Sequence, residues 1–442
     1  MTAPRTGSRS AWMVLALCWL IVIYDGYDLI VYGTTIPALT TEKGWHLSAD
    51  GAGHIGSLAF GGMLVGALFA GAVADRLGRR RTIVVSVLWF SIFTGLCGWA
   101  DGPVMFGSLR FIGGLGLGGL VPSANALAAE FVTPRLRSVA STAMMSGVPV
   151  GGSLAAVIGL HALPAFGWES LYFFAFSGLL LVALTLALLP ESPTWLRAKG
   201  RVSDAAAIEA RYRLRPVAEP EQSEASADAR TTGTAWGVLR APYLVPTLLF
   251  FVATTAGMFA WYGLGTWLPK LTKSDARFDL GNDALTYLLA LNLGAVAVSA
   301  VTAWLGTRYG ALRAAIGTAA VGAISLALLL TYPSSLPVVY LLLILAGVGS
   351  HGTLCLIIAA IANHYPPTLR ATALGSALGG GRVGAVIAPS VAGWLLERTP
   401  GSASSSILLF AAASGVGAVL LLATALFTRP AVTEPVESVF AH

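Results

Sequence analysis

Apolar runs long enough to cross a lipid bilayer recur along almost the whole chain. A membrane-spanning helix needs roughly 20 consecutive apolar residues. Only 11% of the 442 residues are charged, whereas soluble domains carry about 25%. Hydrocarbon offers backbone groups no hydrogen-bonding partner, so such runs are expected to fold as helices. Twelve runs are predicted, at 11–39, 51–74, 82–100, 103–131, 138–163, 168–190, 243–269, 283–306, 313–332, 336–363, 369–397 and 404–428.

A polar stretch separates the first six runs from the last six. We expect a first six-helix half at 1–190, a cytoplasmic linker at 191–242, a second six-helix half at 243–428 and a cytoplasmic tail at 429–442. The start of the linker is predicted to form a short amphipathic helix. Its middle is rich in Pro, Glu, Ser and Ala and lacks apolar periodicity. The expected fold class is an all-α membrane protein with twelve transmembrane helices.

The basic residues indicate which side of the membrane each segment faces. With the N-terminus inside, the predicted cytoplasmic segments hold 20 of the 27 Lys and Arg residues, and the outside loops hold five. Cytoplasmic loops carry the excess of positive charge, so both termini are expected in the cytoplasm. This topology accounts for the net charge of +6, which therefore does not indicate nucleic-acid binding. The two remaining cations, Arg110 and Arg382, fall inside predicted spans.

The two halves resemble each other at equivalent positions. "ADRLGRRR" (74–81) after the second run aligns with "GTRYGALR" (306–313) after the eighth, an offset of 232 residues. "TPRLR" (133–137) after the fourth run aligns with "PPTLR" (366–370) after the tenth, an offset of 233. Duplicated halves in one orientation are related by an axis along the membrane normal, and the substrate is expected between them near the midplane.

Two carboxylates interrupt the first run about halfway along its length. Asp25 and Asp28 are three residues apart and therefore lie on one side of a helix. A charge at that depth costs at least about 2.5 kcal/mol, so an intramembrane acid is by default a functional site. At about 1.5 Å per residue, Arg382 and His351 reach a similar depth, whereas Arg110 lies only about 10 Å inside the outer end of its run.

Two stretches resemble signatures of the major facilitator superfamily. "GALFAGAVADRLGRRR" (66–81) resembles its loop motif G-x-x-x-D-R-x-G-R-[RK]. "LPESPTWL" (189–196) resembles P-E-S-P-R-[WY]-L, with Thr194 in place of the usual Arg. The second copy of the loop motif has Thr307 in place of its Asp. The resemblance implies the major facilitator fold, with two six-helix halves and both termini cytoplasmic.

Four further stretches resemble the aromatic acid:proton symporters of that superfamily. They are "DGYD" in the first run, "RFIGGLGLGGLVPSANALAAE" (110–130), "TWLPKL" (266–271) and "YPPTLRATALGSALGGGRVGAVIAP" (365–389). His351 departs from the pattern, because Gln is the expected residue there. The resemblance implies import of small aromatic carboxylates of the benzoate and hydroxybenzoate type by alternating access. The proton would be the coupling ion, and no other cofactor is implied.

Chemistry assigns roles to the intramembrane residues. A carboxylate in a low-dielectric site beside a like charge holds a proton more readily than in water, so Asp25 and Asp28 are the predicted proton carriers. A guanidinium stays charged and binds two carboxylate oxygens, so Arg382 is predicted to bind the substrate carboxylate. The resemblance to organic-anion transporters implies the same role. His351 is a third proton-coupling candidate. Further candidate substrate contacts are Arg110, Tyr24, Tyr27, Tyr32, Trp261, Tyr262 and Asn125.

Each of these roles has a structural alternative. The Asp pair would instead neutralise Arg110 or Arg382 in a structural ion pair, and Arg110 would instead extend outward to the membrane surface. His351 and the aromatic residues would only pack between helices. Asn125 and Asn292 would only bridge helices. The residues alone leave both sets of roles open.

Charged residues at the predicted cytoplasmic ends of the runs are candidates for gating. Ion pairs between Asp75 and the neighbouring Arg cluster, and between Glu130 and Arg137, would hold one conformation of the transporter. The alternative is that these charges are simply solvated. The predicted gating residues are Asp75, Arg76, Arg79, Arg80, Glu130 and Arg137.

The sequence also bears on functions other than aromatic acid import. A porter for another organic acid, or an exporter, stays open, since "SGVPVGGSL" (146–154) resembles an exporter motif whose Gly-Pro pair is broken by Val148. A sensor would need an output domain, for which the linker and tail have no room. "GLGLGGL" (114–120) lies within a run and indicates close helix packing rather than nucleotide binding. No metal or nucleophile motif indicates an enzyme, so we expect a monomeric, multi-pass transporter of a bacterial-type cell membrane.

Overall fold

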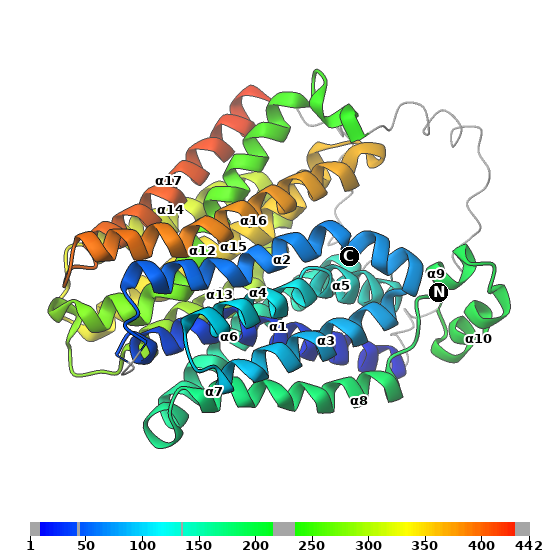
Figure 1. Ribbon diagram of the computed structural model, residues 1–442. Coiled ribbons are helices and arrows are strands. Elements are labelled where there is room, and N and C mark those ends of the chain that lie inside the picture. Colours follow the sequence, from blue (N-terminus) through cyan, green and yellow to red (C-terminus); the bar gives the residue numbers. More distant parts are fainter. Residues whose placement is uncertain (1–8, 42–44, 134–135, 215–234, 429–442) are drawn as a thin grey trace.

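The structure is a computed structural model that describes residues 9–41, 45–133, 136–214 and 235–428 (Figure 1). Every regular element in these residues is a helix. The first part of the chain contains α1 (Arg9–Leu39), α2 (Ala49–Leu77), α3 (Arg79–Leu96), η1 (Cys97–Trp99), α4 (Pro103–Leu117), α5 (Leu120–Glu130), α6 (Arg137–Phe166), α7 (Glu169–Phe173), η3 (Phe174–Ser177) and α8 (Gly178–Leu188).

Two short helices, α9 (Pro193–Ala198) and α10 (Val202–Tyr212), follow at the end of the molecule where the N-terminus lies (Figure 1). α10 lies where the sequence predicts a short amphipathic helix, and the predicted Pro/Glu/Ser/Ala segment falls mostly on 215–234, outside the described residues. The second part contains η4 (Ala235–Leu239), α12 (Leu244–Ser274), η5 (Ala276–Phe278), α13 (Ala284–Tyr309), α14 (Ala311–Leu329), α15 (Leu336–His364), α16 (Pro367–Arg398) and α17 (Ser404–Phe427).

Eleven helical segments of the described chain are long and apolar enough to cross a membrane. They match eleven of the twelve predicted runs, counting α4 with α5, and α7 with α8, as single crossings. The remaining run is α16, which has 32 residues but carries Arg370 and Arg382 and is rich in Gly, Ser and Ala. α16 packs between α2 and α12. An all-α fold of two six-helix halves is therefore confirmed.

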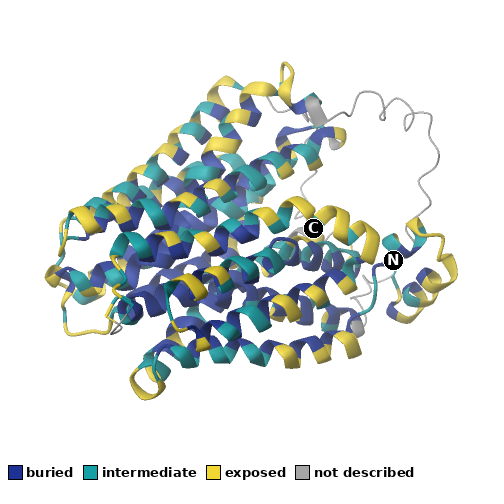
Figure 2. Ribbon diagram, in the orientation of Figure 1, coloured by how far each residue is buried: buried dark blue, intermediate teal, exposed yellow. Residues whose placement is uncertain are grey.

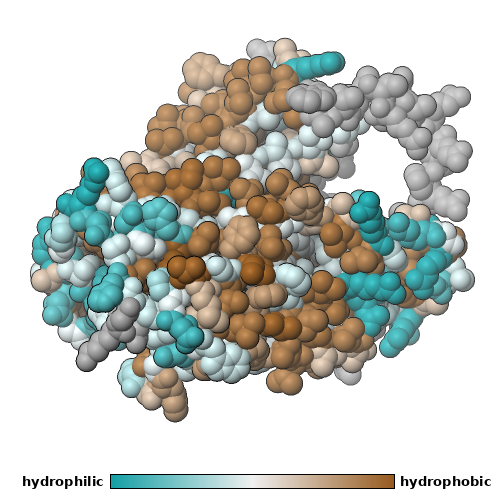
Figure 3. All heavy atoms as spheres, in the orientation of Figure 1, coloured by the Kyte–Doolittle hydropathy of each residue, from teal (hydrophilic) through white to brown (hydrophobic). Residues whose placement is uncertain are grey.

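The distribution of side chains fits a membrane protein. Buried residues fill the inside of the helix bundle, and exposed residues follow the outward faces of the helices (Figure 2). On the face shown in Figure 3, a band of apolar side chains crosses the middle of the molecule, and hydrophilic side chains gather at both ends. Burying this band in hydrocarbon is favourable because the apolar surface leaves water.

The fourth predicted run is broken in the structure. α4 ends at Leu117 and α5 begins at Leu120, because Pro122 has no N–H to donate to the carbonyl of Gly118 and its ring crowds that carbonyl. A Cβ atom at Gly118 would lie 2.2 Å from the backbone nitrogen of Ala67 in α2, so only glycine permits this approach. The glycine-rich stretch thus serves close helix packing, as predicted. Because Pro122 cannot donate to it, the carbonyl of Gly118 is free to accept a hydrogen bond from another helix.

The internal repeat is visible in the backbone. Gly78 joins α2 to α3 with φ of 92°, and Gly310 joins α13 to α14 with φ of 83°. These glycines are the equivalent positions of the two loop motifs, 232 residues apart. Positive φ is readily accessible only to glycine, which explains why both copies of the motif keep it.

The two halves meet along a seam between α2 and α16, and one end of this seam is closed. The hydroxyls of Ser57 and Ser390 are 2.7 Å apart, and Glu397 accepts a hydrogen bond of 2.9 Å from the backbone nitrogen of Ala49. A Cβ atom at Gly53 would lie 2.5 Å from the carbonyl oxygen of Pro389, so backbones touch there. We call this the closed end.

The other end of the seam is open. No atom lies within 4 Å of a Cβ atom built at Gly71 of α2 or at Gly375 of α16. Figure 1 shows the two helices diverging toward the end of the molecule where the N-terminus, α9 and α10 lie. We call this the open end.

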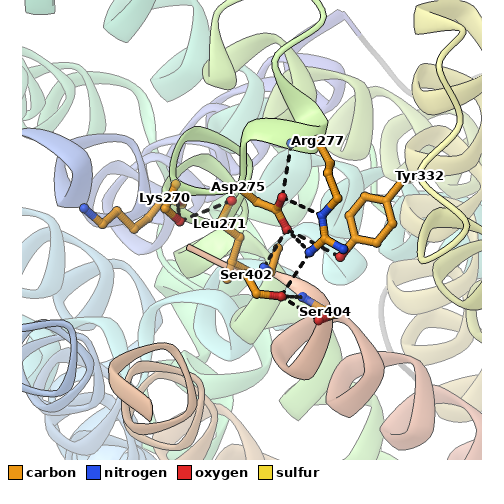
Figure 4. A network of polar contacts seen from close by, with 9 residues as sticks. Lys270, Leu271, Asp275, Arg277, Tyr332, Ser402 and Ser404 are labelled. Carbon is orange, nitrogen blue, oxygen red and sulfur yellow. Dashed lines mark hydrogen bonds and ion pairs between the residues drawn. The ribbon is translucent and has the colours of Figure 1, made fainter. Parts of the chain in front are cut away.

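A polar network braces the second half at the closed end (Figure 4). Asp275 follows α12 and accepts two hydrogen bonds from the Arg277 guanidinium, of 2.9 and 2.7 Å, and one of 2.9 Å from the backbone nitrogen of Ala403. The Arg277 guanidinium stacks 3.7 Å from the ring centre of Tyr332. Burial alone would raise the pKa of Asp275, but the bonds from Arg277 and Ala403 outweigh it and lower that pKa.

Candidate functional site

The two acidic residues of α1 have different surroundings, although both are buried. Asp28 forms an ion pair with Arg110 of α4, whose Nη1 lies 2.9 Å from Asp28 Oδ1. Arg110 Nη2 also donates to the carbonyl oxygen of Asp28 at 2.9 Å, and the Thr94 hydroxyl of α3 donates to Asp28 Oδ1. Asp28 therefore belongs to a fully buried ion pair that ties three helices of the first half together.

Arg110 is not at the shallow, outward position that its distance along the run indicates. Its side chain is 2% exposed and reaches Asp28 rather than the membrane surface. The structure thus shows the ion pair that was one of the alternatives, with Asp28 as the partner, and it does not show the alternative in which Arg110 extends outward. Counting residues gives the depth of a Cα atom only, and the long Arg side chain covers the difference.

Asp25 has no such partner. It is completely buried, and neither carboxylate oxygen accepts a hydrogen bond within the described part of the chain. It is close enough to Asp28, Arg382 and Tyr262 to interact with them electrostatically. An isolated buried carboxylate is very costly in its charged form, so such a group tends to bind a proton instead.

Arg382 reaches from the second half into the first. Its Nη1 donates to the carbonyl oxygen of Met63 in α2 at 3.1 Å, and its Nη2 to that of Gly118 at 3.4 Å. No carboxylate forms an ion pair with it in the part of the chain that the structure describes. The guanidinium has five N–H donors, so most of its hydrogen-bonding capacity is unused.

A small cavity lies against Arg382 between the halves. Its volume is about 50 Å³, and its remaining lining residues are apolar or aromatic: Phe60, Met63, Met258, Tyr262 and Ala385. The rings of Phe60 and Tyr262 are 4.9 Å apart, one from each half. A cation beside aromatic walls suits a ligand with a carboxylate and a ring.

His351 and Trp261 form a second polar pair in the second half. Their rings are 5.0 Å apart, and both residues are buried. His351 Nδ1 and Trp261 Nε1 have no hydrogen-bond partner among the described residues. His351 Nε2 lies 3.6 Å from the Cys355 sulfur. Trp261 Nε1 is thus a buried donor without a partner among the described residues, whereas the backbone of Met145 in the first half lies near the His351 ring.

The remaining candidate contacts lie in helix packing. The hydroxyl of Tyr24 is 2.8 Å from that of Ser177, and Tyr27 and Tyr32 donate to the carbonyls of Leu171 and Ala52 at 2.7 and 2.6 Å. These three tyrosines thus use their hydroxyls inside the first half. Asn125 donates to Ser141 at 3.1 Å, and Asn292 donates to the Leu288 carbonyl at 2.9 Å while its own Oδ1 has no partner among the described residues.

The predicted gating residues lie together at the open end, but with different partners from those expected. Glu130 pairs with Arg79 at 3.7 Å rather than with Arg137, which is exposed. Asp75 and Arg76 are exposed, and no ion pair joins either of them within the described residues. The carboxylate of Glu130 is held by Ser192 and Thr194, and these bonds keep it near Arg79.

The loop motif and the P-E-S-P stretch interlock at this end. Glu191 accepts a hydrogen bond of 3.0 Å from the backbone nitrogen of Arg80, so it caps the N-terminus of α3. A Cβ atom at Gly78 would lie 2.4 Å from Glu191 Oε2. The carboxylate of Glu191 is thus a second reason, besides the positive φ, why glycine fits this position. Arg80 also donates from its guanidinium to the carbonyl of Leu186.

Several contacts between the halves are not evident in the sequence. Lys270 of α12 donates to the Thr40 hydroxyl at 2.9 Å, and Glu397 and Ser390 join α16 to α2. Thr94, which binds Asp28, is likewise an ordinary threonine within an apolar run. The one available signal is the lysine of "TWLPKL", which directly follows an apolar run on the predicted outside.

Comparison with known proteins places the chain among membrane transporters. The sequence profile of the Major Facilitator Superfamily matches residues 18–332 and 286–441. The chain is 44% identical to a gentisate transporter of Corynebacterium glutamicum, over 94% of this chain and 87% of that protein. It is 34% identical to a benzoate transport protein of Acinetobacter baylyi, over 87% of this chain and 84% of that protein.

The fold also resembles a solved structure. The partially occluded inward-open conformation of the xylose transporter XylE from E. coli has a TM-score of 0.75 and 17% identity, and the match covers 97% of this chain and 100% of that one. At this identity the likeness concerns the fold. The chain is thus a multi-pass protein of the cell membrane and a transporter rather than an enzyme. It belongs to the Major Facilitator Superfamily, and within it to the family that contains these gentisate and benzoate transporters.

Proposed function

We propose that the protein is a proton-coupled symporter that imports small aromatic carboxylates of the benzoate and hydroxybenzoate type by alternating access. Its relatives include proteins named as a gentisate transporter and a benzoate transport protein. In this proposal Arg382 binds the carboxylate of the substrate and Asp25 carries the proton. Asp28 serves the coupling through its ion pair with Arg110, and no other cofactor takes part.

The state of Arg382 carries this proposal. A partly buried guanidinium that holds two backbone carbonyls and no carboxylate has donors left for a bidentate bond to an anion. Phe60 and Tyr262 beside it offer ring faces to an aromatic group. A carboxylate ligand would replace two weak partners of Arg382 with one that neutralises its charge.

Asp25 supplies the link to the proton. When an anionic substrate binds to Arg382, Asp25 loses the favourable influence of that positive charge, and protonation of Asp25 becomes more favourable. Binding of a carboxylate and binding of a proton therefore favour each other. Such mutual dependence is the thermodynamic basis of symport.

The cavity must widen before a substrate fits. Its volume of about 50 Å³ is well below the roughly 300–1,000 Å³ of ordinary small-molecule sites. Because the excess of basic residues lies at the open end, we place that end in the cytoplasm, together with both termini and the linker at 191–242. The substrate would then leave toward the cytoplasm from this conformation.

Uptake by cells that contain the transporter tests the proposal. Labelled gentisate, benzoate and protocatechuate are offered with and without a proton uncoupler. We expect at least one of them to accumulate, and the uncoupler to abolish the accumulation. Uptake of none of the three would overturn the assignment to aromatic acids, and accumulation that ignores the uncoupler would overturn proton coupling.

Variants at Asp25 and Arg382 test the proposed roles of these two residues. Asp25→Asn should abolish accumulation but leave exchange of labelled for unlabelled substrate, because the ion pair of Asp28 stays intact. Asp101→Asn, an exposed acid in the loop between η1 and α4, is the matched control. Asp28→Asn is a poorer test, since an unpaired Arg110 would cost about 3–5 kcal/mol of stability.

Arg382→Lys should raise the KM for uptake at least tenfold, because an ammonium group cannot make the bidentate bond. Arg370→Lys, on the same helix but outside the cavity, should leave the KM unchanged. Normal accumulation by both Asp25→Asn and Arg382→Lys would contradict the proposed site.

A further inference from the structure

A larger cavity lies at the open end, away from the proposed substrate site. Its volume is about 540 Å³, within the range of small-molecule sites. Its walls come from the start of α1, the start of α3, the end of α8, and both α9 and α10. It therefore opens where the membrane-spanning parts of α1 and α8 end, at the level of the lipid headgroups in the proposed orientation.

The charge in this cavity is predominantly positive. Arg80, Arg81, Arg201 and Arg211 line it, together with the acids Glu191 and Asp204. Both acids already have partners, because Asp204 pairs with Arg201 at 2.7 Å and Glu191 caps α3 through the backbone nitrogen of Arg80. The guanidinium groups of Arg80, Arg81 and Arg211 form no ion pair within the described residues, so the lining has a surplus of cations.

These cations have donors available. Arg80 binds the carbonyl of Leu186 through one nitrogen, and its Nε is buried without a partner among the described residues. Arg211 lies with its guanidinium 5.6 Å from the ring centre of Tyr212, and its N–H groups donate no hydrogen bond to another described residue. Several guanidinium groups that converge on one cavity favour a phosphate-sized anion.

The rest of the lining is apolar. Met13 of α1, Leu188 of α8 and Ile208 of α10 contribute to the walls. The outward face of α8 continues this surface toward the membrane, because Leu184 is 45% exposed and Leu186 is 52% exposed. A ligand with an anionic head and an apolar body would thus contact arginines and leucines at once.

We propose that this cavity binds the headgroup of an anionic phospholipid, with its acyl chains along the exposed leucines of α8. A soluble phosphate compound would leave the apolar wall in water, whereas a lipid covers it. Basic pockets at the cytoplasmic ends of transmembrane helices suit such headgroups. The site is independent of the transported substrate, because its walls belong to the first half and the two short helices after it.

Lipid binding to the purified protein tests this site. Native mass spectrometry and titration into detergent micelles would compare phosphatidylglycerol with phosphatidylcholine. The test variant is Arg81→Gln with Arg211→Gln. The matched control is Arg313→Gln with Arg213→Gln: Arg313 is the equivalent of Arg81 in the second half, Arg213 neighbours Arg211, and neither lines the cavity.

We expect the test variant to bind phosphatidylglycerol about 25-fold more weakly, or about fivefold for each of the two arginines removed, and the control to bind it normally. If the double variant does not fold, the exposed Arg81→Gln alone should show the fivefold loss. Equal loss in the control, or equal binding of phosphatidylcholine, would overturn the site. Displacement of the lipid by millimolar inorganic phosphate would identify a phosphate site and overturn the lipid assignment.

Discussion

The closed and open ends of the α2–α16 seam differ in how closely the two backbones approach. At the closed end, a Cβ atom at Gly53 would lie 2.5 Å from Pro389, whereas at the open end a Cβ atom at Gly375 would meet no atom within 4 Å. The same pair of helices thus makes tight contact at one end and none at the other. Two halves that tilt as bodies about their centre give this pattern.

Between the described residues of the two halves, the closed end is sealed by small residues and a few hydrogen bonds rather than by ion pairs. Ser57 with Ser390, Glu397 with Ala49, and Lys270 with Thr40 are its polar contacts. Each such bond contributes about 1 kcal/mol, so the polar contacts add only a few kcal/mol to the stability of the closed end. We infer that the seal is built to open during each transport cycle.

The largest effect is expected from Gly53→Leu at the closed end. The new side chain would collide with the backbone of Pro389, so the closed end could not form, and uptake should fall to background. Spin labels at Asp101 and Ser334, which are exposed at this end on different halves, would report the distance in a background without the three native cysteines. That distance should increase.

Gly317→Leu is the matched control for this variant. Gly317 lies on α14, and a Cβ atom there meets no atom within 4 Å. Uptake and the distance between the labels should stay as in the parent protein. Normal uptake by Gly53→Leu itself would mean that the seam closes in another way.

Gly375→Leu at the open end is expected to have an intermediate effect. The present conformation has room for the leucine, so the distance between the labels at the closed end should not change. The open end must close in the other half of the cycle, and there the leucine would obstruct it. Uptake should therefore fall about tenfold. Unchanged uptake would show that α16 does not approach α2 at that end.

Glu397→Ala should have a smaller effect. It removes the acceptor of two backbone N–H groups at the start of α2 and leaves Ser48 as the N-cap of that helix. A loss of about 1 kcal/mol of contact between the halves should raise about fivefold the population in which α2 and α16 have separated at the closed end. The same pair of spin labels would measure that population. Glu169→Ala, at the same end but within the first half, should leave it unaltered.

The smallest effect is expected on thermal stability when the pH is lowered. Because the native pKa of Asp275 lies below its unfolded value of about 3.9, this group stabilises the fold fully above that pH and loses its contribution as the pH falls toward the lower native pKa. Melting of the purified protein between pH 6 and pH 3 should show a drop in Tm below about pH 4. Asp275→Asn should remove most of that dependence, and an identical drop in the variant would assign it to other carboxylates.

Most of the fold could be predicted from the sequence. Apolar length gives the spans directly, since α13 and α15 begin within a residue of the predicted runs at 283–306 and 336–363. The break between α4 and α5 has a signal in the sequence, because Pro122 cannot donate a hydrogen bond to the carbonyl of Gly118. The close approach of Ala67 of α2 to Gly118 has no such signal, because residue patterns describe one helix at a time and this approach is a property of two.

The site was predictable as a set of residues but not as a set of contacts. Asp25 and Asp28 look equivalent in the sequence, yet Arg110 pairs with Asp28 and leaves Asp25 alone. Tertiary packing decides which face of α1 meets α4, and the periodicity of the sequence does not predict that face. For the same reason the sequence does not distinguish Tyr262, beside Arg382, from Tyr27, whose hydroxyl bonds within the first half.

The two carbonyls that accept hydrogen bonds from Arg382 matter for the step of the proposed cycle in which the transporter reorients without substrate. A symporter has to reset without cargo, and a bare guanidinium at the midplane would resist that step. In the present conformation the oxygens of Met63 and Gly118 accept hydrogen bonds from the guanidinium, so its positive charge has protein partners before any substrate carboxylate binds in the proposed cycle.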